Sequence, residues 1–162
     1  MAGKVLILMG SRSDAEVMKE AGRVLSEFGI PYTMTVASAH RAPARTQKLA
    51  KDAERDGYAL IIAGAGMAAH LAGCVAAETI LPVIGVPLPG SMLLGFDALL
   101  STVQMPAGVP VAAMAVGKAG AQNAGYLAAR ILAVSDPAIR EKIRKSRKMM
   151  EAAVAAAAEE LR

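Results

Sequence analysis

The sequence of 162 residues has no tryptophan, one cysteine and two histidines. A single cysteine, Cys74, excludes an internal disulfide, and no Cys, His and Asp grouping has the spacing of metal ligands. Because Cys74 stands in an apolar helical segment, we expect it to be buried, as a small hydrophobic side chain would be. We therefore expect no metal site.

Long apolar runs are also absent, so we expect no membrane span. The first residues lack the pattern of a signal peptide, which predicts a cytoplasmic location. The net charge is +4, and much of it comes from six basic residues between positions 140 and 148. Aromatic residues that could stack on bases do not interleave with them, so we interpret this stretch as a solvated helix face. A nucleic-acid binder remains the less favoured alternative.

The apolar pattern alternates between strands and helices along the whole chain. It predicts strands at 4–9, 32–37, 59–63, 82–86 and 111–116, and helices at about 17–28, 43–56, 64–79, 96–102, 123–134 and from 137 onward. This order predicts an α/β fold, a three-layer α/β/α sandwich around a flavodoxin-like, doubly wound parallel sheet of five strands. Residues 1–162 are expected to form one domain, and ligands are expected at the carboxyl ends of the strands.

The loop after the first strand contains Ser11, Ser13 and Asp14. It leads into a helix, whose free backbone N–H groups and dipole attract anions. The serine hydroxyls could donate to a phosphate, and Asp14 could accept from ribose hydroxyls. Ser13 with Glu16 also fits a capping box, which predicts that Ser13 caps the helix.

The loop after the second strand reads Ser38-Ala39-His40-Arg41. An imidazole can give and take protons near neutral pH, and a guanidinium can bind a phosphate through two hydrogen bonds. His40 is therefore the first candidate for acid/base chemistry, and Arg41 is a candidate phosphate ligand.

The loop after the third strand reads Gly64-Ala65-Gly66-Met67-Ala68-Ala69-His70. Its first six residues fit G-x-G-x-x-A, but the next strand ends without the acidic residue that a dinucleotide site needs. We interpret the loop as a cradle for a small anion or a carboxyl group. A phosphorylation receiver domain is excluded because Ala63-Gly64 occupies the place of its acceptor aspartate.

Together these residues resemble a known family. The motifs Gly10-Ser11-Arg12-Ser13-Asp14, Ser38-Ala39-His40-Arg41, Gly64-Ala65-Gly66 with Ala68-Ala69-His70, and Ser101 to Pro106 followed by Gly108 are similar to those of the N5-carboxyaminoimidazole ribonucleotide mutases. The resemblance covers about residues 4–135 in one register, and four ordered motifs make it specific.

The resemblance implies a cofactor-free isomerase of purine biosynthesis, which moves a carboxyl group from the exocyclic nitrogen of its nucleotide substrate to ring carbon C4. It implies that His40 is the catalytic acid/base, that Ser11, Ser13 and Arg41 hold the phosphate, and that Asp14 holds the ribose. The migrating carboxyl group would lie among Ala68, Ala69 and His70. It also implies a homo-octamer in which the last helix, about 137–162, packs on a neighbouring subunit.

Two other functions stay open at this stage. A sister branch carboxylates aminoimidazole ribonucleotide directly with carbon dioxide. It typically has Lys after the catalytic His and lacks the third-loop His, so Arg41 and His70 favour the mutase. The other alternative is a nucleotide-binding module without catalysis. The family often has Gly where Met67 stands, and a Met there would be strained if the site needs a positive φ.

Overall fold

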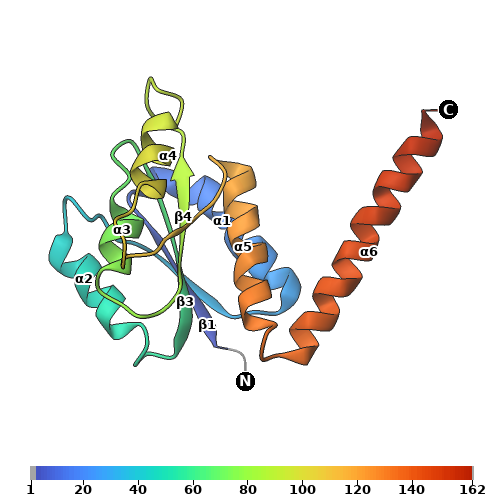
Figure 1. The fold of residues 1–162 in the computed structure, drawn as a ribbon, viewed down its shortest axis with the longest axis horizontal. Helices are drawn as coiled ribbons and strands as arrows, with labels where there is room; N and C mark the ends of the chain where they lie inside the picture. The colour runs from blue at the N-terminus through green and yellow to red at the C-terminus, as the bar shows by residue number, and fades with distance from the viewer. Residues whose placement is uncertain (1–2, 162) are drawn as a thin grey trace.

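A parallel sheet of five strands forms the centre of the computed structural model, which describes residues 3–161 (Figure 1). The strands are β1 (Lys4–Met9), β2 (Tyr32–Val36), β3 (Tyr58–Gly66), β4 (Val83–Leu88) and β5 (Ala112–Ala113). Their order is β2-β1-β3-β4-β5, and every neighbouring pair is parallel. The doubly wound sheet predicted from the sequence is therefore confirmed, and the loops after its strands meet at one edge.

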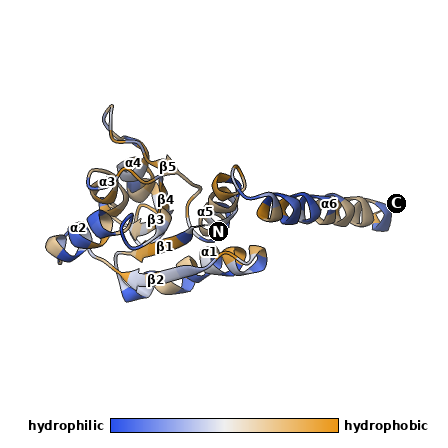
Figure 2. Cartoon of the chain, turned by 90° about the horizontal axis from the view of Figure 1, so that it is seen from below, coloured by the Kyte–Doolittle hydropathy of each residue, from blue (hydrophilic) through white to orange (hydrophobic). Residues whose placement is uncertain are grey.

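Helices cover both faces of this sheet (Figure 2). They are α1 (Ala15–Phe28), α2 (Pro43–Asp52), α3 (Leu71–Ala76), α4 (Phe96–Val103), α5 (Lys118–Leu132) and α6 (Pro137–Glu160), and a short 3₁₀ helix, η1 (Arg12–Asp14), precedes α1. α1 and α5 pack together on one face, while α2, α3 and α4 lie on the other. The result is the three-layer sandwich.

The core is divided in two by the pleat of the strands. On β1, Val5 and Ile7 face α1 and α5, whereas Leu6 and Leu8 face α2 and α3. All four side chains are buried. Strand β1 is therefore apolar on both faces, as expected for a parallel sheet that helices cover on both sides.

Several element boundaries differ from the sequence-based predictions. β3 continues through Gly66 because Ala65 and Gly66 pair with the end of β4, so α3 begins only at Leu71. β5 is reduced to Ala112–Ala113 because only these residues pair with β4. α2 ends at Asp52 rather than residue 56, and α5 begins at Lys118 rather than residue 123.

Two predictions about single side chains are wrong. Ser13 does not cap α1: the Ser11 hydroxyl caps η1, and Asp14 occupies the N-cap of α1. Cys74 is exposed rather than buried, because α3 turns Leu71, Ala72 and Val75 inward and Cys74 lies outside that arc.

The first turns of α6 are fixed to the rest of the fold. The Asp136 carboxylate caps the helix by accepting from two backbone N–H groups, and Ile139 is buried. Arg140 donates to the carbonyls of Ala133 and Val134, and Lys142 donates to Phe28 O at 2.8 Å. Two of the six basic side chains between positions 140 and 148 thus bind helix ends instead of only facing solvent.

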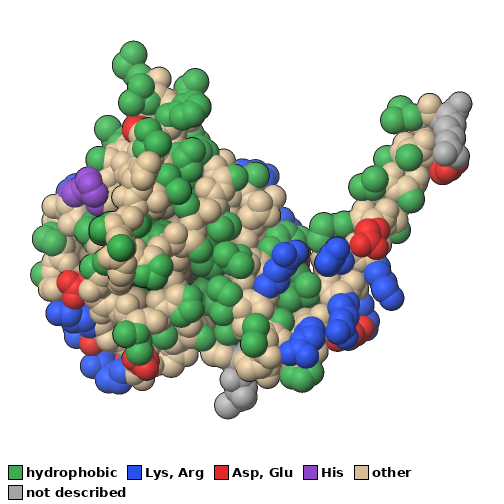
Figure 3. Space-filling view, in the orientation of Figure 1, with side chains coloured by type: hydrophobic (Ala, Val, Ile, Leu, Met, Phe, Trp, Pro, Cys, Tyr) green, Lys and Arg blue, Asp and Glu red, His purple; other side chains and the backbone are tan. Residues whose placement is uncertain are grey.

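The remainder of α6 leans away from the sheet (Figure 1), and Figure 3 shows its basic side chains gathered along the half nearer the body. Among the described residues, no helix combines the length and the apolar character that crossing a membrane requires.

Candidate active site

The loops at the carboxyl edge of the sheet line a cavity of about 690 Å³, within the usual size range of small-molecule sites. Its walls are Gly10, Ser11, Ser13, Asp14, Ser38, Ala39, His40, Arg41, Ala65, Gly66, Met67, Ala68, Ala69, His70, Leu71, Pro89 and Gly90. Every site residue predicted from the sequence lies on this wall except Gly64. The structure therefore brings the three loops together around one space.

The first wall is the turn after β1. The Asp14 carboxylate accepts the Ser11 N–H at 2.8 Å, and the Ser13 hydroxyl donates to the Ser11 hydroxyl at 3.0 Å. Ser11 and Asp14 thereby satisfy each other as a capping box around η1. This bonding holds both serine hydroxyls and one carboxylate at the cavity wall.

The ionisation of Asp14 depends on its burial. Partial burial raises the pKa of this carboxyl group above its ordinary value of 3.8, because desolvation disfavours the charged form. The Ser11 N–H, the Ser13 hydroxyl and the positive charge of Arg41 oppose this rise. The Asp14 carboxylate is thus a hydrogen-bond acceptor, and its negative charge is partly compensated by the neighbouring groups.

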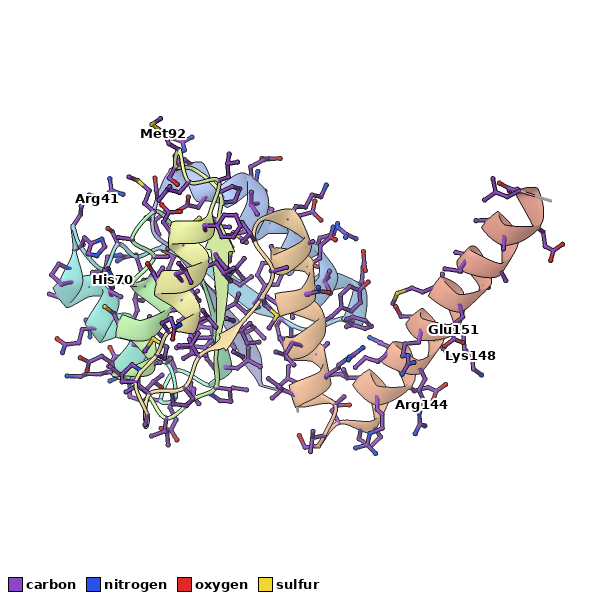
Figure 4. The ribbon with its side chains drawn as sticks, turned by 45° about the horizontal axis from the view of Figure 1, so that its top comes forward. Arg41, His70, Met92, Arg144, Lys148 and Glu151 are labelled. Carbon is purple, nitrogen blue, oxygen red and sulfur yellow. The ribbon has the colours of Figure 1, made fainter. Side chains whose placement is uncertain are left out.

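Arg41 links the first two loops. Its Nη2 donates to Gly10 O at 3.1 Å, and its backbone N–H donates to the Ser38 hydroxyl at 3.2 Å. The side chain is exposed and projects at the edge of the molecule (Figure 4). Its remaining N–H donors are therefore available to an anion beside the serines.

His40 and His70 contact each other on the cavity wall. His40 Nε2 lies 2.8 Å from His70 Nδ1, and the two rings are nearly perpendicular, with 5.0 Å between their centroids. Both side chains are exposed to solvent. The second and third loops therefore place two groups capable of proton transfer at one point of the wall.

The third wall is the end of β3 rather than a helix start. Gly64 does not reach the cavity: it is buried, its carbonyl accepts the Gly10 N–H, and Met18 fills the space where a side chain would be. Its role is to let α1 pack closely on the sheet. Gly66 does line the cavity and lies against the backbone of Leu88, which leaves little room for a side chain.

Five wall residues were not among the predicted site residues: Gly10, Met67, Leu71, Pro89 and Gly90. Pro89 and Gly90 follow β4 directly, so the rule that ligands bind at the carboxyl ends of strands could have found them. Met67 adopts a φ of 54°, the conformation that favours glycine, and its side chain is 63% exposed.

The cavity wall combines two chemically different sets of residues. Ser11, Ser13, Asp14, Ser38 and Arg41 supply hydroxyl, carboxylate and guanidinium groups, which suit a phosphorylated sugar. Ala65, Ala68, Ala69, Leu71 and Pro89 supply a small apolar surface. The histidine pair also lines the cavity. This arrangement suits proton transfer on a small nucleotide.

Known proteins match this chain over most of its length. The family model described as AIR carboxylase matches residues 4–153. The chain belongs to the AIR carboxylase family. Relatives named N5-carboxyaminoimidazole ribonucleotide mutase include those of Pyrococcus horikoshii, 55% identical over 90% of this chain and 81% of the relative, and Thermotoga maritima, 52% identical over 98% and 91%. The Escherichia coli K12 mutase is 48% identical over 90% and 86%.

The fold of this AIR carboxylase family member also matches a solved structure. A crystal structure of Treponema denticola PurE superposes with a TM-score of 0.89 at 29% identity, and the match covers 98% of each chain. Because that coverage includes nearly all residues, the whole arrangement of elements is shared with the solved relative.

Proposed function

We propose that this chain is an N5-carboxyaminoimidazole ribonucleotide mutase, an isomerase that moves the carboxyl group from the exocyclic nitrogen to C4 of the imidazole ring. Relatives of that name align over about nine-tenths of the chain at about half identity. The observation that carries the proposal is the cavity itself, where an anion-binding turn, His40 and a small apolar wall meet.

In the proposed binding mode the phosphate lies between Ser11, Ser13 and Arg41. The two hydroxyls and the free guanidinium N–H groups would donate to its oxygens. Asp14 would accept from a ribose hydroxyl. The imidazole ring would then lie against the apolar residues of the wall, with the migrating carboxyl group near Ala68, Ala69 and His70.

The proposed reaction needs one proton to arrive and one to leave. The bond between the exocyclic nitrogen and the carboxyl carbon breaks, carbon dioxide forms, and His40 protonates the nitrogen. C4 then attacks the carbon dioxide, and His40 removes the C4 proton. The proton is thereby returned and the reaction balances. Acid/base catalysis of this kind typically contributes about 10²–10⁴-fold to the rate.

Substitution of His40 tests this role. His40→Asn removes the titratable group and leaves the phosphate-binding residues in place, so kcat should fall by about 10²–10⁴-fold. Nucleotide affinity, measured by calorimetry with the product, should change only a few-fold. A fully active variant would show that His40 does not move the proton.

Direct carboxylation is the second candidate function, because the matching family model is described as AIR carboxylase. An ultraviolet assay with each ribonucleotide, with and without added bicarbonate, separates the two. The mutase converts N5-carboxyaminoimidazole ribonucleotide without bicarbonate, whereas the carboxylase requires carbon dioxide. Binding without conversion of either nucleotide would instead indicate a non-catalytic module.

We also propose a cytoplasmic homo-octamer in which α6 packs on a neighbouring subunit. Ile139, Ile143, Met150 and Val154 recur at helical spacing along α6. Ile139 is buried on its own domain, but Met150 and Val154 are 48% and 71% exposed. The apolar stripe thus continues beyond the surface that the same chain provides, and a second copy would cover the rest.

Assembly can be tested on the full chain by analytical ultracentrifugation. The wild type should sediment as eight subunits, and Met150→Glu with Val154→Glu should shift it to smaller species. Lys148→Glu changes the charge of the same helix outside the stripe and is the matched control (Figure 4). A double variant that remains octameric would show that this part of α6 makes no subunit contact.

A further inference from the structure

Met67 is the one non-glycine residue on the cavity wall with a positive φ, 54°. The left-handed conformation is unfavourable for side chains because Cβ crowds the following carbonyl oxygen. Strain of this kind persists where the surroundings hold it in place, and it concentrates at functional sites. The presence of a methionine in this glycine-favouring conformation therefore points to a role of the Met67 side chain.

Met67 lines the cavity together with Ala68, Ala69 and Leu71. Met67 is 63% exposed to solvent, whereas Ala69 and Leu71, which follow it in the chain, are only 3% and 2% exposed. Pro89 and Gly90 lie on the same wall, and apart from the chain neighbours of Gly90 no residue comes within 4 Å of the position where its Cβ would be. The apolar part of the wall is thus exposed to solvent at Met67, which has the longest apolar side chain that lines the cavity.

In the proposed reaction, carbon dioxide could escape where this part of the wall is exposed to solvent. Carbon dioxide is small and uncharged, so the polar groups around Ser11 and Arg41 cannot retain it. Any molecule that diffuses out leaves aminoimidazole ribonucleotide behind instead of product. Effective capture by C4 requires that the carbon dioxide stay beside the ring.

We propose that Met67 is a shielding residue, whose thioether chain covers the carboxyl end of the bound nucleotide and limits exchange of carbon dioxide with water. Methionine suits this task because its unbranched, polarizable chain adapts to irregular apolar surfaces. The left-handed backbone at Met67 sets the direction in which this side chain leaves the main chain. This inference rests on the proposed mutase reaction.

Isotope exchange tests the shield directly. The full-length enzyme converts unlabelled substrate in ¹³C-bicarbonate buffer with carbonic anhydrase present, and mass spectrometry measures ¹³C in the product; a sample without enzyme gives the spontaneous exchange. Met67→Ala keeps Cβ and the backbone strain but removes the chain, so ¹³C incorporation should rise several-fold above wild type. Met67→Leu keeps an apolar chain and should stay near wild type.

The outcomes separate this inference from the function on which it rests. Equal incorporation in Met67→Ala and wild type would overturn the shield, and so would a rise in Met67→Leu as large as in Met67→Ala. A rise in Met67→Gly without one in Met67→Ala would assign the effect to the backbone and likewise overturn it. If the chain were not a mutase, the wild-type enzyme would itself require added bicarbonate for turnover.

Discussion

His40 Nε2 and His70 Nδ1 lie 2.8 Å apart, although 30 residues separate them in the sequence. At this distance one nitrogen donates and the other accepts, so a single hydrogen lies between the rings. The contact fixes how the His40 ring is turned in the cavity before a ligand enters. His70 is thus a positioning residue for His40 in the free enzyme.

Breaking this contact should affect turnover more than binding. In His70→Ala the His40 ring loses its partner, so kcat should fall while nucleotide affinity changes only a few-fold. Because the chain has only these two histidines, modification by diethylpyrocarbonate reports on His40 alone in this variant. The His40 ring should react faster than in the wild type.

His70→Gln is the matched control for that experiment. Its amide can hydrogen-bond to His40 Nε2, so part of the activity should return and modification of His40 should slow again. If both variants had the same activity and reactivity, the contact between the two rings would have no positioning role.

The sequence predicted the sheet and most of the cavity because both follow from local patterns. The alternation of apolar strands and helices predicted the order of the elements, and a parallel arrangement alone brings the carboxyl ends of the strands together. The sequence pattern could not show how far each strand pairs with its neighbours in the sheet. The pairing of Gly66 with Leu88 extends β3, and this long-range contact leaves no local signal.

The surroundings of two further residues depend on distant packing in the same way. Cys74 lies on an apolar segment, but its exposure depends on which side of α3 packs against the sheet. Gly64 belongs to a motif shared with ligand-binding loops, yet Met18 of α1 packs against it from within the fold. The sequence shows residue types and spacing, whereas these outcomes depend on how distant elements pack.

Removal of the Arg41 guanidinium should weaken binding of the phosphate specifically. A hydrogen bond to a charged group contributes about 1.5–3 kcal/mol, so Arg41→Ala should lower nucleotide affinity by about 10–100-fold. The affinity of the corresponding nucleoside, which has no phosphate, should stay unchanged. Lys48→Ala is the control, because Lys48 pairs with Asp52 on the same helix and lines no cavity that contains Ser11 or Arg41.

Relief of the strain at Met67 should stabilise the fold. A left-handed non-glycine residue costs about 1–2 kcal/mol, and the extra freedom of glycine in the unfolded chain offsets about 0.4–1 kcal/mol of the gain. Met67→Gly should therefore raise the free energy of unfolding by about 1 kcal/mol, which calorimetry would detect as about 2–4 °C in Tm. Ala68→Gly, at a position without positive φ, should lower Tm instead.

Glu20 connects α1 to α5 and should give the fold an acid-sensitive component. Its carboxylate accepts from Gln122 Nε2 at 2.8 Å and from Arg23 Nε at 3.1 Å, and it pairs with Lys118 Nζ at 3.2 Å. The hydrogen bond from Gln122, followed by those from Arg23 and Lys118, lowers the pKa of Glu20 from 4.5 to about 2. These partners stabilise the ionised form in the folded protein.

The sign of the pH dependence follows from that shift. The unfolded chain binds the proton near pH 4.5 and the folded chain only near pH 2, so the stabilisation is complete above pH 4.5 and is lost as the pH falls toward 2. Urea unfolding at pH 7, 4.5 and 3 should show a smaller loss in Glu20→Gln than in the wild type. Glu16→Gln, which breaks only an exposed pair with Lys19, should keep the wild-type slope. An unchanged slope in Glu20→Gln would contradict the proposed link between the helices.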